Sequence, residues 1–388
     1  MIALAFGLWL ALLAALPMLA LVRARRATAA AFTAAPVPSV PVGGVLLRPC
    51  TGSPPWLTAA LSTVPSGAPG LRLRFTVDRS DDPARPIAES VASHLRARGV
   101  DAATCVLGVP GLNRKAAQLV SGAGAFAEAP FLVVADADVD LSRVDLRPLV
   151  EPLLAGRAAA VWQPVVESPG ETPADRASAA LLGASLHAFP LIGRLDPTGL
   201  VGKLFAFEPR RVTAAGALTA GVEVLGEDMA LAERLGAHGE RIEMAPGAAA
   251  SLARGRSAEA LLERYTRWML VVRTQRPGRL WSYPALFLGP WGLFCGGLGL
   301  AVVDPGAGLA IALGALLVRQ ATAEVARRLA GRRLPRPPIR DLVAADALLA
   351  CAFVSALRAR GVTWAGRHLP LRPNRPPLHE STPHAPTR

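Results

Sequence analysis

The chain has 388 residues, of which 52% are hydrophobic and only 18% are charged. Ordinary soluble domains carry about 25% charged residues, so this composition argues against a simple water-soluble enzyme, and the high apolar content excludes a disordered chain. The formal net charge is +13, which indicates nucleic-acid binding only if the basic residues gather on a suitable surface.

The N-terminal residues form a long uncharged run, and roughly 20 apolar residues are enough to cross the hydrocarbon core of a bilayer. A basic cluster, Arg23, Arg25 and Arg26, follows the run, and no basic residue precedes it. This order predicts an uncleaved transmembrane anchor over residues 1–22, with the residues that follow in the cytoplasm. A cleaved signal peptide is the alternative interpretation.

A second apolar region covers residues 280–326 and is interrupted at Asp304, Pro305 and Gly306, which favour a tight turn. The pattern predicts a transmembrane hairpin. The arginines between residues 327 and 340 then lie in the cytoplasm together with the first basic cluster. Because these basic residues flank apolar runs, they indicate membrane topology and contact with the lipid bilayer, and no nucleic acid is expected as a partner.

The C-terminal part of the chain departs from a simple membrane pattern. Arg319 and Glu324 weaken the end of the predicted hairpin, and the short apolar run that follows contains Asp346. The segment 342–369 is therefore predicted as a re-entrant or transmembrane helix followed by an interfacial stretch, and both alternatives stay open. Residues 370–388 are rich in Pro and Arg and are predicted to be disordered.

Between the terminal apolar segments, residues 41–255 alternate between strand-like and helix-like patterns. Apolar runs such as residues 131–135 end in polar turns, and the helical pattern of residues 86–99 ends at a glycine. The alternation predicts an α/β domain that binds its ligands at the carboxyl ends of the strands.

Two carboxylates, Asp136 and Asp138, follow one of these buried apolar runs. Their spacing suits two ligands of one hard cation, and Mg²⁺ or Mn²⁺ bound there leaves room for substrate phosphates. Such a cation can neutralise a leaving diphosphate. An acidic loop that only caps the next helix is the alternative, and the spacing alone does not decide between the two.

Acidic residues mark two further positions. Asp78, Asp81 and Asp82 follow an earlier strand-like run, and Glu227 and Asp228 open a predicted helix. A carboxylate at a helix N-terminus is stabilised by the helix dipole, so N-capping is one interpretation of the second pair. The other interpretation is a general base that deprotonates an acceptor hydroxyl.

Residues 256–279 predict an interfacial helix that carries Arg264, Arg267 and Trp268. The two arginines are three residues apart and share one helix face, where they could pair with phosphate, and Trp268 could line an acceptor pocket. A juxtamembrane helix that only meets anionic lipid headgroups is the alternative.

Taken in order, these features resemble one family. Acidic residues after an early strand, then DxD, ED and RxxRW before C-terminal apolar spans are similar to the pattern of processive-type family 2 glycosyltransferases. Within that family the chain most resembles the ceramide glucosyltransferases and the hopanoid-associated glycosyltransferases. The family commonly has Lys in place of Arg48 and Asn in place of Gln118. The matching segments are LLRP at 46–49, DDPA at 81–84, NRKAAQL at 113–119, RYTRW at 264–268 and WAGR at 364–367.

The resemblance implies an α/β fold, with a GT-A (Rossmann-like) glycosyltransferase domain and N-terminal and C-terminal transmembrane helices. It implies an integral protein of the cell inner membrane with a cytoplasmic catalytic domain. The implied reaction is an inverting transfer of a hexose, with glucose the first candidate, from a UDP-sugar to a membrane lipid hydroxyl such as that of ceramide. A hopanoid or another lipid acceptor, a processive polysaccharide synthase and a non-enzymatic scaffold are the alternatives.

The resemblance also implies roles for individual residues. Asp228 would be the catalytic base, with Glu227 beside it. Asp136 and Asp138 would hold Mg²⁺ or Mn²⁺. Trp268 would contact the acceptor, and His187 lies in the region where an acceptor is expected. The residues implied to bind the donor are Asp78, Asp82, Asn113, Lys115, Asp136, Arg264, Arg267 and Trp268.

Overall fold

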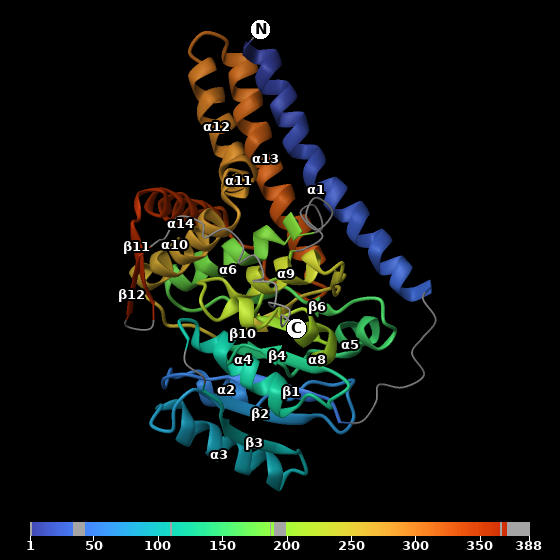
Figure 1. The fold of residues 1–388 in the computed structure, drawn as a ribbon. Helices are drawn as coiled ribbons and strands as arrows, with labels where there is room; N and C mark the ends of the chain where they lie inside the picture. Colours follow the sequence, from blue (N-terminus) through green and yellow to red (C-terminus); the bar gives the residue numbers. More distant parts are fainter. Residues whose placement is uncertain are drawn as a thin grey trace, which may run out of the picture.

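The protein consists of a sheet-containing domain and a bundle of long helices that projects from it, as the computed structural model shows (Figure 1). Segments from both ends of the chain form the bundle, so the sheet-containing domain lies between them in the sequence. The residues that the structure describes are 2–33, 43–108, 111–186, 188, 189, 199–364 and 367–370.

A seven-stranded sheet forms the centre of the domain, with the order β3-β2-β1-β4-β8-β6-β9. β1 to β4 pair in parallel, and β8 runs antiparallel to both of its neighbours. Most positions of the central strands are buried, as expected for a sheet covered on both faces. The strands are β1 (Val45–Pro49), β2 (Arg72–Val77), β3 (Ala102–Val106), β4 (Leu132–Ala135), β6 (Ala160–Trp162), β8 (Leu204–Phe207) and β9 (Ile242–Met244).

Alternate strand residues point to opposite faces of the sheet and pack into two separate cores. Leu46 packs with residues of α3 and α5, whereas its neighbours Val45 and Leu47 pack with residues of α4, α8 and α9. Helices on both faces of a largely parallel sheet confirm the predicted α/β class. The helices of the domain are α2 (Leu57–Leu61), α3 (Ala84–Ala97), α4 (Arg114–Ala125), α5 (Arg147–Leu154), α6 (Pro173–Ser185), α8 (Pro209–Ala214), the 3₁₀ turn η1 (Thr219–Gly221) and α9 (Glu227–Ala237).

A small sheet, ordered β5-β10-β7, extends from the segment that follows β4. Its strands are β5 (Val139–Asp140), β7 (Val165–Glu167) and β10 (Ala249–Ser251). Ser251 pairs with Val139 on one side and with Glu167 on the other. The small sheet therefore brings Ser251 and Glu167 to the carboxyl end of β4, where Asp136 and Asp138 lie.

The projecting bundle contains α1 (Ile2–Thr33), α12 (Gly289–Leu300) and α13 (Pro305–Leu329), which pack against one another. A Cβ atom added to Gly308 would lie 2.2 Å from the backbone nitrogen of Ala301, so glycine is needed where α12 and α13 meet. Within the described part of the chain, two helical segments are long and apolar enough to cross a membrane, Ile2–Ala24 and Pro305–Leu329.

The first half of the predicted hairpin is not one continuous α-helix. The chain forms α11 (Pro277–Leu280), then a π-helical turn η2 (Pro284–Leu288), and only then α12. Pro284 and Pro290 have no backbone N–H and interrupt regular helical hydrogen bonding. Composition predicted the apolar run, but the prolines shorten the regular helix within it.

Two helices lie between the bundle and the sheet. α10 (Ala258–Gln275) and α14 (Ile339–Arg358) pack against each other, and α14 also packs on α6. In the segment predicted as a re-entrant or transmembrane helix, α14 turns an apolar face to the protein, and a hairpin of β11 (Gly361–Trp364) and β12 (Arg367–Pro370) follows. Residues 371–388 of the predicted disordered tail lie outside the described residues.

Candidate active site

The acidic motifs of the sequence meet at one edge of the large sheet. Asp78 follows β2 and Asp136 follows β4, and parallel strands bring these carboxyl ends together. Lys115, from α4, connects this edge to the start of α9, because its Nζ lies 2.7 Å from Asp136 Oδ1 and 3.0 Å from Glu227 Oε1. The DxD and ED motifs, far apart in sequence, therefore share one lysine.

Each carboxylate of the DxD motif is held by a different lysine. Lys115 pairs with Asp136, and Lys203 pairs with Asp138, which also accepts a hydrogen bond from Ser251 Oγ at 2.7 Å. Burial acts against the charge of Asp138, but Lys203 outweighs it and holds the pKa of Asp138 well below its usual range. Asp138 is therefore an ionised carboxylate inside the protein.

The DxD carboxylates fit a divalent cation that also binds the donor. Asp138 Oδ1 is buried and has no hydrogen-bond partner among the described residues, so this oxygen is available as a ligand. The described residues contain no group of three or more His, Cys, Asp or Glu side chains suited to a metal. Mg²⁺ and Mn²⁺ commonly bind one or two carboxylates together with substrate phosphates and water, which matches the two carboxylates of the DxD motif.

Asp228 is a half-buried carboxylate with a raised pKa. Its oxygens accept hydrogen bonds from the backbone N–H groups of Gly202, at 2.9 Å, and Met229, at 2.8 Å. Burial, and then the neighbouring charge of Glu227, raise the pKa of Asp228 to about 6. The N-cap of α9 is Gly226, so Asp228 is not the capping residue, although it accepts backbone hydrogen bonds in the first turn of the helix. A pKa of about 6 suits the alternative interpretation, a general base.

Glu227 is fixed on both of its oxygens, one by Lys115 and the other by Asn113 Nδ2 at 3.0 Å. Asn113 also caps α4, since its Oδ1 accepts from the backbone N–H of Ala116 at 3.1 Å. Burial opposes the ammonium charge of Lys115, but Asp136 and Glu227 raise its pKa above the ordinary value. Asn113 and Lys115 therefore hold the two acidic motifs in place.

The two aspartates expected near the nucleotide differ in whether a carboxylate oxygen is left without a hydrogen-bond partner. Asp82 is buried and accepts from Gly52 N at 2.8 Å, Thr51 Oγ1 at 3.0 Å and Ala84 N at 2.9 Å, so both of its oxygens are used. Asp78 pairs with Arg114 at 3.1 Å through Oδ2, and its Oδ1 is buried without a partner in the described structure. Asp78 therefore has the free acceptor.

Arg264 and Arg267 of α10, which we call the α10 arginines, carry unused donors. Arg264 pairs with Glu167 at 2.5 Å and lies over the Trp268 ring at 4.7 Å, but its Nη2 is buried without a partner in the described structure. Arg267 makes no hydrogen bond or ion pair with a described residue, and burial, followed by the like charge of Arg264, lowers its pKa. Two neighbouring guanidinium groups with free N–H donors are suited to an anion such as a diphosphate.

α10 packs directly on the segment that leads into the ED motif. Gln275 Nε2 donates to the carbonyl oxygen of Gly226 at 3.1 Å. A Cβ atom on Gly226 would lie 2.3 Å from Val271 Cγ1, so only glycine permits this approach. The position of α10 therefore affects the start of α9. Trp268 packs in an apolar cluster that includes Met229, whereas His187 lies outside the described residues.

Three residues that the sequence interpretation did not assign take part in the site. Lys203 is one of only two lysines in the chain, which was the available signal for it. Glu167 is buried beneath Arg264 and Arg256; burial opposes its charge, but the two arginines lower its pKa to about 2. Arg48 is fully buried and donates to the carbonyl oxygens of Asp136 and Val139 at 3.3 and 2.6 Å, so it holds the DxD loop.

Among solved structures, the chain is similar to the mannosyltransferase PcManGT from Pyrobaculum calidifontis in complex with GDP-Man and Mn²⁺. The TM-score is 0.51 at 18% identity, over 92% of this chain and 98% of that one. This likeness confirms the GT-A type of fold. The glucosyl-3-phosphoglycerate synthase from Mycobacterium tuberculosis in complex with phosphoglyceric acid is more distant, with a TM-score of 0.37 and 17% identity over 60% of this chain and 80% of that one.

No curated protein sequence matches the chain. Residues 7–376, which include every acidic and basic motif described above, match the family described as Glycosyl transferase family 21. The match confirms the resemblance to membrane glycosyltransferases of the ceramide glucosyltransferase type, and it agrees with the fold and with the meeting of the DxD, ED and RxxRW motifs. The chain therefore belongs to glycosyl transferase family 21.

Proposed function

We propose that the protein transfers a hexose, with glucose the first candidate, from a UDP-sugar to the hydroxyl of a membrane lipid such as ceramide. The observation that carries the proposal is the position of Asp228. Its half-buried carboxylate, with a pKa of about 6, lies near Lys115, which also binds the first DxD carboxylate. A base with such a pKa is ionised at neutral pH and still able to accept a proton.

In the proposed reaction, Asp228 accepts the proton of the lipid hydroxyl as that oxygen attacks the anomeric carbon. The bond between the anomeric carbon and the diphosphate oxygen breaks, and its electron pair leaves with UDP. One direct displacement inverts the anomeric centre. The free N–H donors of the α10 arginines stabilise the charge that develops on the diphosphate. A divalent cation bound at Asp136 and Asp138 would add charge neutralisation at the same phosphates.

Donor binding in this proposal divides between the sheet edge and α10. Asp78, with its free Oδ1, is the candidate contact for the nucleotide, and Asp82 acts through the loop that it holds. Lys115 and Asn113 position the carboxylates, and Trp268 stacks on Arg264 at the boundary with the acceptor. The cation would be Mg²⁺ or Mn²⁺.

The apolar side chains that pack next to Asp228 support a lipid acceptor. Met229, which follows Asp228 in α9, packs in one cluster with Trp268, Tyr283 and Phe287, and the latter two belong to the predicted membrane hairpin. A lipid could keep its hydrocarbon part on this side while its hydroxyl reaches the carboxylate. With α1 and α13 crossing the cell inner membrane, the catalytic domain would lie on the cytoplasmic side, where the basic clusters are expected.

Incubation of membranes that contain the protein with radiolabelled UDP-glucose and ceramide tests the proposal. The expected product is a labelled lipid that carries one hexose. If the label appears in a hopanoid or another lipid, that lipid is the acceptor in place of ceramide. A labelled polymer would indicate a polysaccharide synthase. If the folded protein labels no lipid with any UDP-hexose, the proposal is wrong.

A further inference from the structure

Two charges that weaken the predicted membrane segments are each other's partners. Arg319 of α13 and Asp346 of α14 form a forked ion pair, with Nε 2.7 Å from Oδ2 and Nη2 2.9 Å from Oδ1. The indole N–H of Trp291, from α12, donates to the same Oδ2 at 2.6 Å. The side chains of Arg319 and Asp346 are only 4% and 5% exposed, so three helices meet at one buried carboxylate.

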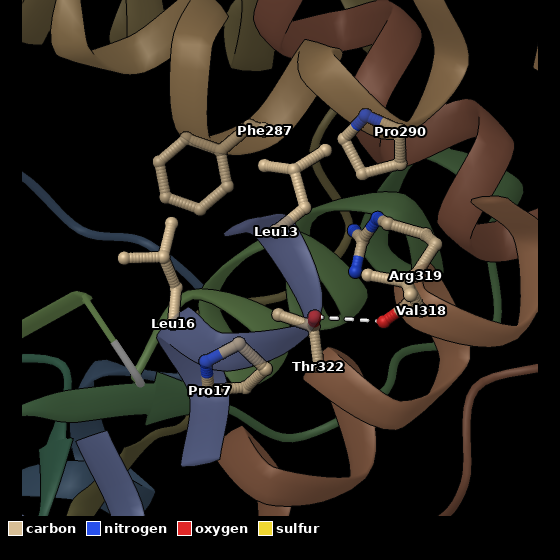
Figure 2. A pocket seen from close by; sticks show the side chains of 8 residues that line it. All are labelled: Leu13, Leu16, Pro17, Phe287, Pro290, Val318, Arg319 and Thr322. Carbon is tan, nitrogen blue, oxygen red and sulfur yellow. Dashed lines mark hydrogen bonds between the residues drawn. The ribbon is translucent and has the colours of Figure 1, made fainter. Parts of the chain in front are cut away.

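The surroundings of Arg319, the partner of this carboxylate, are largely apolar. Figure 2 shows Arg319 beside Pro290 of α12, and Leu13 and Pro17 of α1 line the same narrow crevice. A guanidinium that forms two parallel hydrogen bonds to a carboxylate fixes the distance between the two groups and their relative orientation. Desolvation offsets much of the attraction in a buried ion pair, so its best-attested use is to select one arrangement of the elements that carry it.

α14 connects the buried carboxylate to the candidate active site. Its apolar face packs on α10 in one cluster that contains Phe353 of α14 and Tyr265 of α10. Arg273 of α10 donates to the carbonyl oxygens of Ala356 at 2.5 Å and Ala359 at 3.0 Å, at the end of α14. α14 is therefore held at Asp346 by the helices α12 and α13, which we call the apolar hairpin, and at its end by α10.

We infer that the joint formed by Arg319, Asp346 and Trp291 fixes α14, and through α14 the helix α10, to the apolar hairpin. Asp346 is then a positioning residue for the α10 arginines, which it does not contact. The inference rests on the proposed function, because that function assigns the α10 arginines to the diphosphate. A displacement of about 1 Å caused by a remote change can lower a rate by roughly 100-fold.

The first test is Asp346→Asn, which keeps the size of the side chain and removes the charge that holds Arg319. We expect kcat to fall by at least about tenfold. The affinity for UDP should fall by a smaller factor, since the sheet edge keeps its share of the donor contacts. Glu324→Gln is the control on α13, the helix that carries Arg319, because it removes a half-buried carboxylate that pairs with Arg327, Arg328 and Arg336 away from the joint. The control should keep kcat within about twofold of the unchanged protein. An equal loss in both variants would overturn the inference.

A second variant separates positioning from stability. The double substitution Arg319→Leu and Asp346→Leu replaces the ion pair by apolar side chains, which buried sites often tolerate without loss of stability. We expect the Tm to return to the value of the unchanged protein while kcat remains at least about fivefold lower, because leucines do not fix the orientation of α14. Full recovery of kcat together with Tm would mean that the pair only stabilises the fold, and the inference would be wrong.

A readout without catalysis keeps the inference separate from the proposed function. If the unchanged protein glycosylates no lipid, the proposed function fails, but hydrogen–deuterium exchange of the full chain still tests the joint. Asp346→Asn should speed exchange in α14 and α10 and leave β1 and β4 unchanged. Uniform acceleration, or no change in α10, would contradict the inference.

Discussion

At the scale of single residues, the site is a set of carboxylates separated by two lysines. Asp136 and Glu227 share Lys115, Asp138 pairs with Lys203, and Asp228 has no lysine within hydrogen-bond distance among the described residues. Burial therefore has a different outcome at each carboxylate: the pKa of Asp138 falls and that of Asp228 rises. This contrast supports the proposal that Asp138 is a cation ligand of the DxD motif and that Asp228 is the base.

The base assignment predicts that Asp228→Asn abolishes transfer while UDP binding survives. Asparagine keeps an oxygen for the backbone N–H of Gly202 but cannot accept the proton of the acceptor, and loss of a general base costs roughly 100-fold to 10,000-fold in rate. Calorimetric titration with UDP and Mn²⁺ supplies the binding measurement. Loss of UDP binding in this variant would contradict the base assignment.

The pKa of Asp228 predicts a particular pH profile. A base must be deprotonated to act, so kcat/KM should rise with pH through about 6 and level off above it, and it should fall as the pH drops below that value. Initial rates with a fixed UDP-sugar concentration between pH 4.5 and 8, as roughly the range where the base titrates, give the profile. A rate that does not change across this range would exclude Asp228 as the titrating group.

At the scale of elements, the sequence predicted the strands and helices better than the contacts between them. Residues 131–135 predicted the buried strand β4, because a short apolar run before an acidic turn has few other solutions in an α/β domain. The hairpin was predicted from its apolar composition, which does not show that Pro284 and Pro290 interrupt the regular helix. Glu167 and Lys203 could not be assigned, because strand pairing places them at the site and a single sequence does not state pairing.

One buried side chain predicts how strongly the DxD loop depends on β1. Arg48→Met would remove the hydrogen bonds from the guanidinium to the carbonyl oxygens of Ala60, Asp136, Ala137 and Val139, and a hydrogen bond that involves a charged group contributes about 1.5–3 kcal/mol. We expect Tm to fall by roughly 5–10 °C and Mn²⁺-dependent UDP binding to weaken. Arg48→Lys should recover part of both losses, because an ammonium can reach some of the same carbonyls.

The control for this prediction is Arg85→Met. Arg85 forms an ion pair with Glu89 on the surface of α3, with side-chain exposures of 39% and 49%, and such pairs contribute little to stability. Thermal unfolding monitored in detergent should show a small shift for Arg85→Met and a large one for Arg48→Met. Equal shifts would show that Arg48 does not support the DxD loop.

At the scale of the whole molecule, the chain joins a GT-A domain to apolar helices from both of its ends. The composition that argued against a simple soluble enzyme is explained by this division, since α1 and α13 are long and apolar enough to cross a membrane. The sequence predicted the order of the motifs and thereby the family. It could not predict that Arg319 and Asp346 pair, because each charge alone weakens a predicted membrane segment and only the packing of three helices makes them partners.

The central claim is a single transfer from a UDP-sugar to a membrane lipid with Asp228 as the base. Mass spectrometry of lipids from purified protein reconstituted in liposomes with ceramide, UDP-glucose and Mn²⁺ tests it most directly. We expect a ceramide that carries one hexose from the unchanged protein and none from Asp228→Asn. A polymer, an unmodified ceramide from protein that still binds UDP, or equal product from both proteins would contradict it.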